Sequence, residues 1–290
     1  MSKHHHHVPQ FILKNFYGAK NLYYFNKNWP DKGIESRNKS SVFQKHHLYS
    51  IKNRDGTLDS SIETGHFKDI DTQTDPIVTK IIERVRNNEL PNLSTTEKVT
   101  WDRFFIDQIF RSPEQMNSPS TIGTINRIFD EETKVINRLL RENNRDDLIK
   151  LLNKPEFQER VKQGAIRKSL ISDRKKPLRV LNERGLYIAK ITNLNKSFII
   201  GSNALVRYNN SGTDNLEDET VELWFPISWD IAISPGPANK KEMFLPVRDR
   251  VIRKTNLIIA RQSDEVASRS RQLLVSLLNK SGYLEQIKVR

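Results

Sequence analysis

The chain has 290 residues, of which 36% are hydrophobic and 29% charged, and it contains no cysteine. This composition can bury a sizeable core, which argues against extended disorder and fibrous repeats. Without cysteine there are no disulfides, thiolate nucleophiles or Cys-ligated zinc or iron–sulfur sites. No apolar run approaches the ~20 residues of a membrane span, and the first residues lack the apolar segment of a secretory signal. We therefore expect a cytoplasmic protein without a membrane partner.

Charge is the strongest global feature, with 48 Lys and Arg against 35 Asp and Glu and a net charge of +13. The basic residues cluster between Arg160 and Lys176 and again after Asn239. Such an excess indicates a polyanionic partner, RNA or DNA, if the fold joins the clusters into one face. The alternative is a basic surface that only keeps the protein soluble. The candidate nucleic-acid contacts are Lys175, Lys176, Arg250, Arg253, Lys254 and Arg261.

Residues 1–60 have the pattern of short strands separated by turns. Aromatic and β-branched residues occur there in brief runs, and turn-forming sequences such as Trp29–Gly33 separate them. From about residue 61 to 176 the apolar residues recur with the period of an α-helix. Ser94 followed by Glu97 predicts a capping box at the start of a helix that runs to about Ser112, and further helices are expected at 120–141, 146–152 and 155–172.

Residues 177–246 return to short runs rich in Ile, Val, Phe, Tyr and Trp, which predict a small antiparallel sheet. An Asn-Asn-Ser-Gly turn at 209–212 and an acidic loop after it interrupt this region. Two basic helices are expected at the end, at about 247–260 and 263–278, the second capped by Ser263. The predicted fold class is α+β: a mainly helical core, a short irregular β segment at the N-terminus and a small sheet in the C-terminal half. We expect one continuous domain, 1–290.

All seven histidines lie within the first 66 residues, the last being His66. Imidazole is the side chain best suited to proton transfer near neutral pH, so His6 is a candidate general acid or base. A purely structural role, with His6 bonded to a backbone carbonyl before Pro9, is the alternative. Four consecutive histidines near the N-terminus could also be a purification tag.

Gln108 and Arg111 lie three residues apart on a predicted helix and therefore share a face. A buried Arg111 needs a partner, and a carboxylate such as Glu63 or Asp71 would form a structural ion pair with it. The alternative is that Arg111 holds a substrate phosphate. Gln10 and Gln108 would then be neutral donors, His6 the acid or base, and the set would need no metal. The predicted catalytic residues are His6, Gln10, Glu63, Gln108 and Arg111.

A metal site is a weaker possibility. Glu63 and His66 form a Glu-x-x-His pair that could hold a divalent cation together with Asp71, although this short pattern arises often by chance. The sequence contains no Walker A loop, dinucleotide fingerprint, His-Glu-x-x-His or Gly-x-Ser-x-Gly motif. Nucleotide-driven motors, dinucleotide oxidoreductases and the common hydrolases are therefore disfavoured.

The N-terminal segment resembles the opening of a bacterial family catalogued as domain of unknown function 4238. The matching stretch is His5-His6-His7-Val8-Pro9-Gln10 followed by Leu13 and Phe16, with His7 where the family usually has Tyr or Phe. The resemblance continues at Glu63, Asp71, Gln108 and Arg111-Ser112-Pro113. Because of this resemblance, a purification tag alone does not explain the histidines. The resemblance implies no activity.

The residues favour a nucleic-acid-acting enzyme, most simply an endoribonuclease-like phosphodiesterase. The alternative is a binding or regulatory module without catalysis that uses the same basic face. A third interpretation is a subunit of an assembly, with a protein partner or a second copy of the chain.

Overall fold

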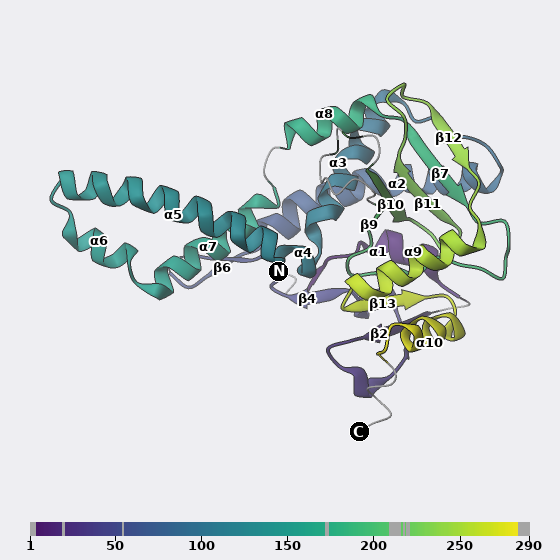
Figure 1. The fold of residues 1–290 in the computed structure, drawn as a ribbon, viewed down its shortest axis with the longest axis horizontal. Helices are drawn as coiled ribbons and strands as arrows, with labels where there is room; N and C mark the ends of the chain where they lie inside the picture. The colour runs from purple at the N-terminus through teal and green to yellow at the C-terminus, as the bar shows by residue number, and fades with distance from the viewer. Residues whose placement is uncertain are drawn as a thin grey trace.

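The computed structural model describes residues 4–18, 21–53, 55–171, 174–208, 216, 218 and 221–283. The predicted turn at 209–212 and most of the acidic loop lie outside these residues. Figure 1 shows a body of helices and sheets from which three helices project as an arm. The α+β class predicted from the sequence is confirmed, with several small sheets and a strand-rich N-terminal segment.

The largest sheet lies in the C-terminal half and has the strand order β12-β7-β11-β10-β9. Its neighbours are antiparallel except β12, which runs parallel to β7. The strands are β7 (Leu186–Lys190), β9 (Val206–Tyr208), β10 (Glu222–Pro226), β11 (Ile231–Pro235) and β12 (Glu242–Leu245).

Helices cover both faces of this sheet. On one face lie α2 (Lys68–Arg86) and α3 (Thr95–Arg111), and the rings of Phe104 and Phe105 are 6.1 and 6.4 Å from that of Phe225. On the other face, α9 (Asp249–Gln262) shares a cavity with Trp224 of the sheet. Trp224 and Phe225 are consecutive residues of β10, so their side chains point to opposite faces of the sheet.

A second sheet, in the order β3-β2-β13-β8, joins the two ends of the chain. Its strands are β2 (Leu22–Asn26), β3 (Glu35–Arg37), β8 (Ile200–Gly201) and β13 (Glu265–Ser268), and α10 (Arg271–Lys280) packs on it beside α9. Phe25, Ile259, Val266, Leu274 and Leu278 form its buried core. This sheet places the basic C-terminal helices next to each other.

The N-terminal residues add short elements around the body. Two ribbons pair β1 (His4–His6) with β4 (Gln44–His46) and β5 (Ile51–Lys52) with β6 (Leu58–Asp59). The short helices are α1 (Gln10–Leu13), η1 (Lys14–Phe16), η2 (Pro30–Lys32), η3 (Lys39–Ser41) and α4 (Pro113–Met116). A π-helical turn, η4 (Ile62–Phe67), leads directly into α2. Such turns occur frequently at functional sites.

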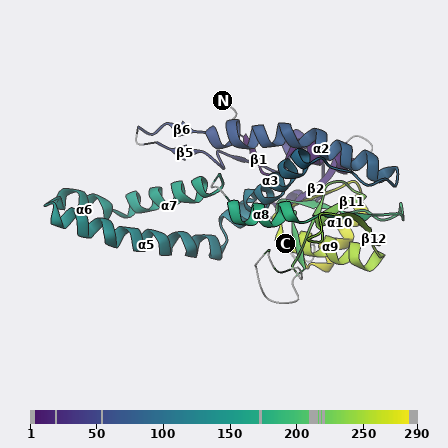
Figure 2. The ribbon, with the colours of Figure 1, turned by 90° about the horizontal axis from the view of Figure 1, so that it is seen from above.

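The arm consists of α5 (Pro119–Glu142), α6 (Asp146–Leu152) and α7 (Pro155–Ser169). Figures 1 and 2 show α5 running outward and α7 returning to the body, with the β5–β6 ribbon beside α7. These helices were predicted from their apolar period. The predicted capping box is also present, since the Ser94 side chain accepts from the Glu97 amide and Glu97 accepts from the Ser94 amide.

Two predictions about the C-terminal half were wrong. Residues 265–268 form the strand β13 instead of the first turn of a helix, because β2 and β8 satisfy its backbone on both sides, and α10 begins only after the cap Ser270. Ser263 instead bonds the backbone of Asn203. The helical region also extends beyond 176, since α8 (Lys175–Glu183) packs on α3. Tertiary packing overrode local preference in both cases.

Among the described residues, no helix has the length and apolar character needed to cross a membrane.

Candidate functional site

Four of the predicted catalytic residues, His6, Gln10, Glu63 and Arg111, lie close together where β1, α1, η4 and α3 meet. The ring Nε2 of His6 lies 3.3 Å from the Nε2 atom of Gln10, and the backbone amide of His6 donates to Glu63 Oε1 at 3.4 Å. His6 and Gln10 are partly buried, while Gln108 is buried. The fold thus brings together residues that are more than a hundred positions apart in the chain.

Arg111 forms the ion pair that was the structural alternative. Its guanidinium donates to both carboxylate oxygens of Asp71, at 2.7 and 3.0 Å, and lies 4.3 Å from the centre of the Phe67 ring. Its side chain is only 1% exposed. Burial works against its charge, but the carboxylate of Asp71 outweighs burial and raises the pKa of Arg111. A phosphate could use the two terminal nitrogens of Arg111 only by displacing Asp71.

Protonation in this cluster follows from burial. Burial, with the positive charge of Arg111, lowers the pKa of His6, so its imidazole is neutral at pH 7 and can accept a proton. Burial raises the pKa of Glu63 in spite of Arg111. Glu63 Oε2, Gln108 Nε2 and Arg111 Nε have no hydrogen-bond partner among the described residues. Catalytic roles for these residues remain predictions.

A second polar group lies at the far end of η4. His66 Nε2 is 2.8 Å from Asp107 Oδ2, and Arg174 donates to Asp107 Oδ1 at 3.0 Å. These residues line a cavity of about 360 Å³ together with Arg103 and apolar side chains of α3 and α8. Asp107 can hold the imidazole of His66 in one tautomer, which leaves its other nitrogen free to take a proton.

The sequence did not point to Asp107. Its position one helical turn before Arg111 was the available signal, because a carboxylate on a buried helix face requires a partner. The suggested metal ligands do not converge either: Asp71 is paired with Arg111 and His66 with Asp107. In the described part of the chain, no group of three or more His, Asp or Glu is arranged to hold a metal ion.

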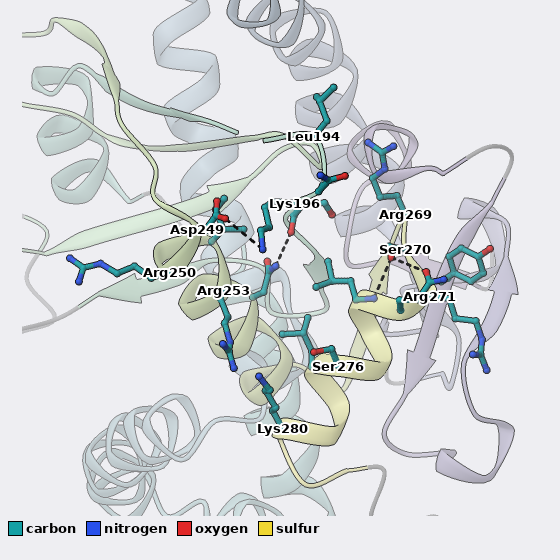
Figure 3. A pocket seen from close by; sticks show the side chains of 18 residues that line it. Leu194, Lys196, Asp249, Arg250, Arg253, Arg269, Ser270, Arg271, Ser276 and Lys280 are labelled. Atoms are coloured by element: carbon teal, nitrogen blue, oxygen red, sulfur yellow. Dashed lines mark hydrogen bonds and ion pairs between the residues drawn. The ribbon is translucent and has the colours of Figure 1, made fainter. Parts of the chain in front are cut away.

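A groove of about 950 Å³ lies between α9, α10 and the loop at residues 194–197. Figure 3 shows Arg253 of α9 and Lys280 of α10 projecting toward the same end of this groove. Arg250 and Arg271 project outward on either side, and Asp249 is the only acid among the described residues that line it. The cations are Lys196, Arg250, Arg253, Arg269, Arg271 and Lys280. We call this cavity the basic groove.

Buried hydrogen bonds hold the walls of the basic groove in place. The side chain of Asn256 on α9 accepts from the Ile199 amide at 3.0 Å and donates to the Ser197 carbonyl at 2.8 Å. Ser270 caps α10 by accepting from the Leu273 amide at 3.2 Å. The guanidinium of Arg269 lies 4.0 Å from the ring centre of Trp229. These contacts fix the backbone of the groove walls, while most of the Lys and Arg side chains that line the groove are exposed.

A second cavity, of about 520 Å³, lies on the other side of α9. It is lined by Tyr208 and Trp224 and by Arg250 and Lys254, and the Lys254 ammonium is 4.7 Å from the centre of the Tyr208 ring. Arg250 lines both this aromatic cavity and the basic groove. Phosphate-binding cations and flat aromatic surfaces are the two components of single-strand binding sites.

The fold places the predicted basic residues on two different faces of the molecule. Arg250 and Arg253 line the basic groove and Lys254 lines the aromatic cavity, whereas Arg261 is exposed at the end of α9 and is among the lining residues of neither. Lys175 and Lys176 begin α8, which packs on α3, on the opposite face of the large sheet (Figure 1). The expected single basic face is therefore two separate ones, because the sheet lies between them.

Sequence reasoning missed several residues of the groove and of the aromatic cavity. Lys196 lies far in sequence from the segment that carries Arg269, Arg271 and Lys280, and only their place beside α9 shows that they form one set. In the aromatic-rich N-terminal strand β2, Tyr24 and Phe25 are buried, whereas Tyr23 lines the basic groove. Tyr208 and Trp224, which line the aromatic cavity, come from β9 and β10 of the large sheet.

A protein-family model described as "Protein of unknown function (DUF4238)" matches residues 4–272. The chain belongs to this family. The match includes the histidines of the N-terminal segment, α3, α9 and the aromatic cavity, but it ends before Lys280 of the basic groove. Searches among curated proteins and among solved structures gave no match.

Proposed function

We propose that this protein binds single-stranded nucleic acid along α9. The phosphates lie in the basic groove, and at least one base lies against Tyr208 and Trp224 in the aromatic cavity. The observation that carries the proposal is that Arg250 lines both cavities, so a strand crossing α9 would meet cations and aromatic rings in succession. The absence of cysteine agrees with a cytoplasmic setting.

Charge supports a polymer over a small anion. The six cations of the basic groove face one acid, Asp249, which lies 3.6 Å from Lys196. A small anion would be held by two or three donors converging on one point. In Figure 3 the labelled cations instead come from α9, α10 and the loops beside them, and they do not all converge on one point. Such a spread suits a chain of phosphates, whose charges repeat along the backbone.

The test is fluorescence anisotropy with a labelled single-stranded oligonucleotide at several salt concentrations. Arg253→Gln with Lys280→Gln removes two phosphate contacts, and it should weaken binding about tenfold and reduce the slope of log affinity against log salt by about 1.4. Tyr208→Leu should also weaken binding, by about tenfold, but should leave the salt slope unchanged because stacking carries no net charge.

The matched control is Lys68→Gln with Arg179→Gln, which removes the same charge from exposed positions on α2 and α8. This variant should bind like the wild-type protein. Equal losses in the two double variants would mean that only net charge matters. A wild-type protein that does not bind the oligonucleotide at low salt would refute the proposal.

A second candidate function is cleavage of a phosphodiester, favoured by the His66–Asp107 pair in its cavity. His66, oriented by Asp107, would accept a proton from the attacking hydroxyl or water. Arg103 and Arg174 line the same cavity and would stabilise the charge that develops on the phosphate. The cluster of His6, Gln10, Glu63, Gln108 and Arg111 is the other possible centre.

Hydrolysis of a chromogenic phosphodiester such as bis(p-nitrophenyl) phosphate separates these centres. If His66 is the base, His66→Asn should lower the rate at least a hundredfold, Asp107→Asn should lower it less, and His6→Ala should leave it near the wild-type value. The reverse pattern would assign the chemistry to His6. If none of the three variants differs from the wild-type protein, both catalytic assignments fail, and the binding function stands alone.

A further inference from the structure

The arm carries apolar side chains that no described part of the chain covers. None of the residues of α5 or α6 is buried, although α5 is 24 residues long. Ile128, Val135 and Leu139 of α5 are 45–48% exposed. A helix of this length in water is normally stabilised by packing its apolar face, and a two-helix hairpin leaves part of that face open.

The open positions form a row along α5. Val135 lies seven residues after Ile128 and Leu139 four residues further, so the three share one side of the helix. The less exposed residues Ile125, Phe129 and Leu140 lie about a quarter turn away, on the side that packs toward α7. The β5–β6 ribbon lies along the α7 side of the hairpin (Figure 2). Among the residues that the structure describes, the α5 side stays open.

The charge of α5, the helix that carries the apolar row, identifies its partner. It contains four Lys and Arg and four Asp and Glu, so its net charge is zero within a chain of net charge +13. A neutral surface has no attraction for nucleic acid, and two copies can approach through it without the repulsion that their bodies would suffer. The acidic residues Glu131 and Glu132 precede the basic residue Arg138 on α5. If the α5 helices of two copies pair antiparallel with their Val135 residues opposite each other, the two glutamates of each copy lie near Arg138 of the other.

We propose that a second copy of this chain docks arm to arm, with the Ile128–Val135–Leu139 rows of the two α5 helices packed against each other. The contact is isologous, since the same patch is used by both copies. It converts two helical hairpins into a four-helix arrangement and buries the apolar rows. The two basic grooves, which lie on the bodies away from the arms (Figure 1), remain open in this dimer.

The test is sedimentation velocity with the full chain over about a hundredfold range of concentration. The wild-type protein should pass from monomer to dimer as its concentration rises. Val135→Asp with Leu139→Asp should remain monomeric at the highest concentration, with an unchanged circular dichroism spectrum, because both positions are exposed in the monomer. Lys134→Asp makes the same change of two charge units on the other side of α5 and should still dimerise.

A wild-type protein that stays monomeric throughout, or a Val135→Asp, Leu139→Asp variant that dimerises like the wild type, would overturn the proposal. Equal loss of dimer in the Lys134→Asp control would also overturn it, because charge and not the apolar row would then govern association. Glu132→Lys and Arg138→Glu should each weaken the dimer, and their combination should restore it. Failure of this rescue would refute the antiparallel arrangement.

Discussion

At the scale of single residues, His7 combines complete burial with a titratable ring. It packs edge-on against Phe43, and its Nε2 atom is 3.8 Å from Glu265 Oε1. Burial lowers its pKa well below the ordinary value, so the folded protein keeps this ring neutral where the unfolded chain takes up a proton. The stability that this provides is fully present above pH ~6.5 and is lost as the pH falls.

We therefore predict that His7→Phe makes the protein less sensitive to acid. The aromatic ring would keep the packing and would remove the protonation penalty, as well as two ring nitrogens that have no hydrogen-bond partner among the described residues. Between pH 8 and pH 5 the wild-type protein should lose at least about 1 kcal/mol more unfolding free energy than the variant. Urea unfolding at the two pH values measures this difference. Parallel losses in the two proteins would contradict the prediction.

The buried pair of Lys98 and Asp102 is a second prediction at this scale. The Lys98 ammonium contacts the two Asp102 oxygens at 2.6 and 2.5 Å and also donates to the Leu181 carbonyl at 2.9 Å, which links α3 to α8. Asp102→Asn leaves a buried cation without its counter-charge and should cost roughly 3 kcal/mol, whereas Lys98→Met with Asp102→Asn should be close to the wild type. Unfolding of the single and double variants by urea tests this; a double variant as unstable as the single one would rule it out.

The same pair affects the pH dependence of stability. Burial raises the pKa of Asp102 to about 6, in spite of Lys98. Because the unfolded value is near 4, the folded protein holds a proton that the unfolded chain releases, and the contribution of Asp102 to stability falls as the pH rises from about 4 to 6. This sign is opposite to that of His7, so the Lys98→Met, Asp102→Asn variant should lose this decline while keeping the acid sensitivity caused by His7.

At the scale of elements, the contact between β8 and α9 depends on a residue without a side chain. A Cβ atom at Gly201 would lie 2.2 Å from Ser263 Oγ and 2.7 Å from Ile259 Cγ2, so α9 would have to move away from the sheet. Gly201→Ala should destabilise the protein by about 1–3 kcal/mol. The matched control, Gly164→Ala in α7, meets no atom within 4 Å and should stabilise by about 0.5–1 kcal/mol. Thermal unfolding of both variants measures the contrast, and a neutral Gly201→Ala would contradict the observed packing.

At the scale of the whole molecule, stability is distributed unevenly between the body and the arm. Helices α2 and α3 contribute many fully buried residues, whereas α5 and α6 contribute none. In dilute solution we expect the amides of α5 and α6 to exchange with deuterium much faster than those of α3. Hydrogen-exchange mass spectrometry at low and high protein concentration checks this and should show protection of α5 appearing as copies pair. Uniform protection of α3 and α5 at high dilution would contradict it.

The sequence alone determined those features that local chemistry controls. The apolar period located the long helices, and Ser94 with Glu97 defined the start of α3 because both partners of a capping box lie in one turn. A buried Arg111 paired with a carboxylate was also foreseeable, since an unpaired buried guanidinium is too costly to persist.

Only the tertiary structure decided the rest. Residues 265–268 became a strand because β2 and β8, far away in the sequence, satisfied their backbone groups. The His66–Asp107 pair joins positions 41 residues apart, and the basic groove combines three segments whose separate charges look like ordinary solvated surface. Local patterns record which face of an element is apolar or charged. Which faces meet depends on the packing of the whole chain, because the free energy of burial is shared among segments distant in sequence.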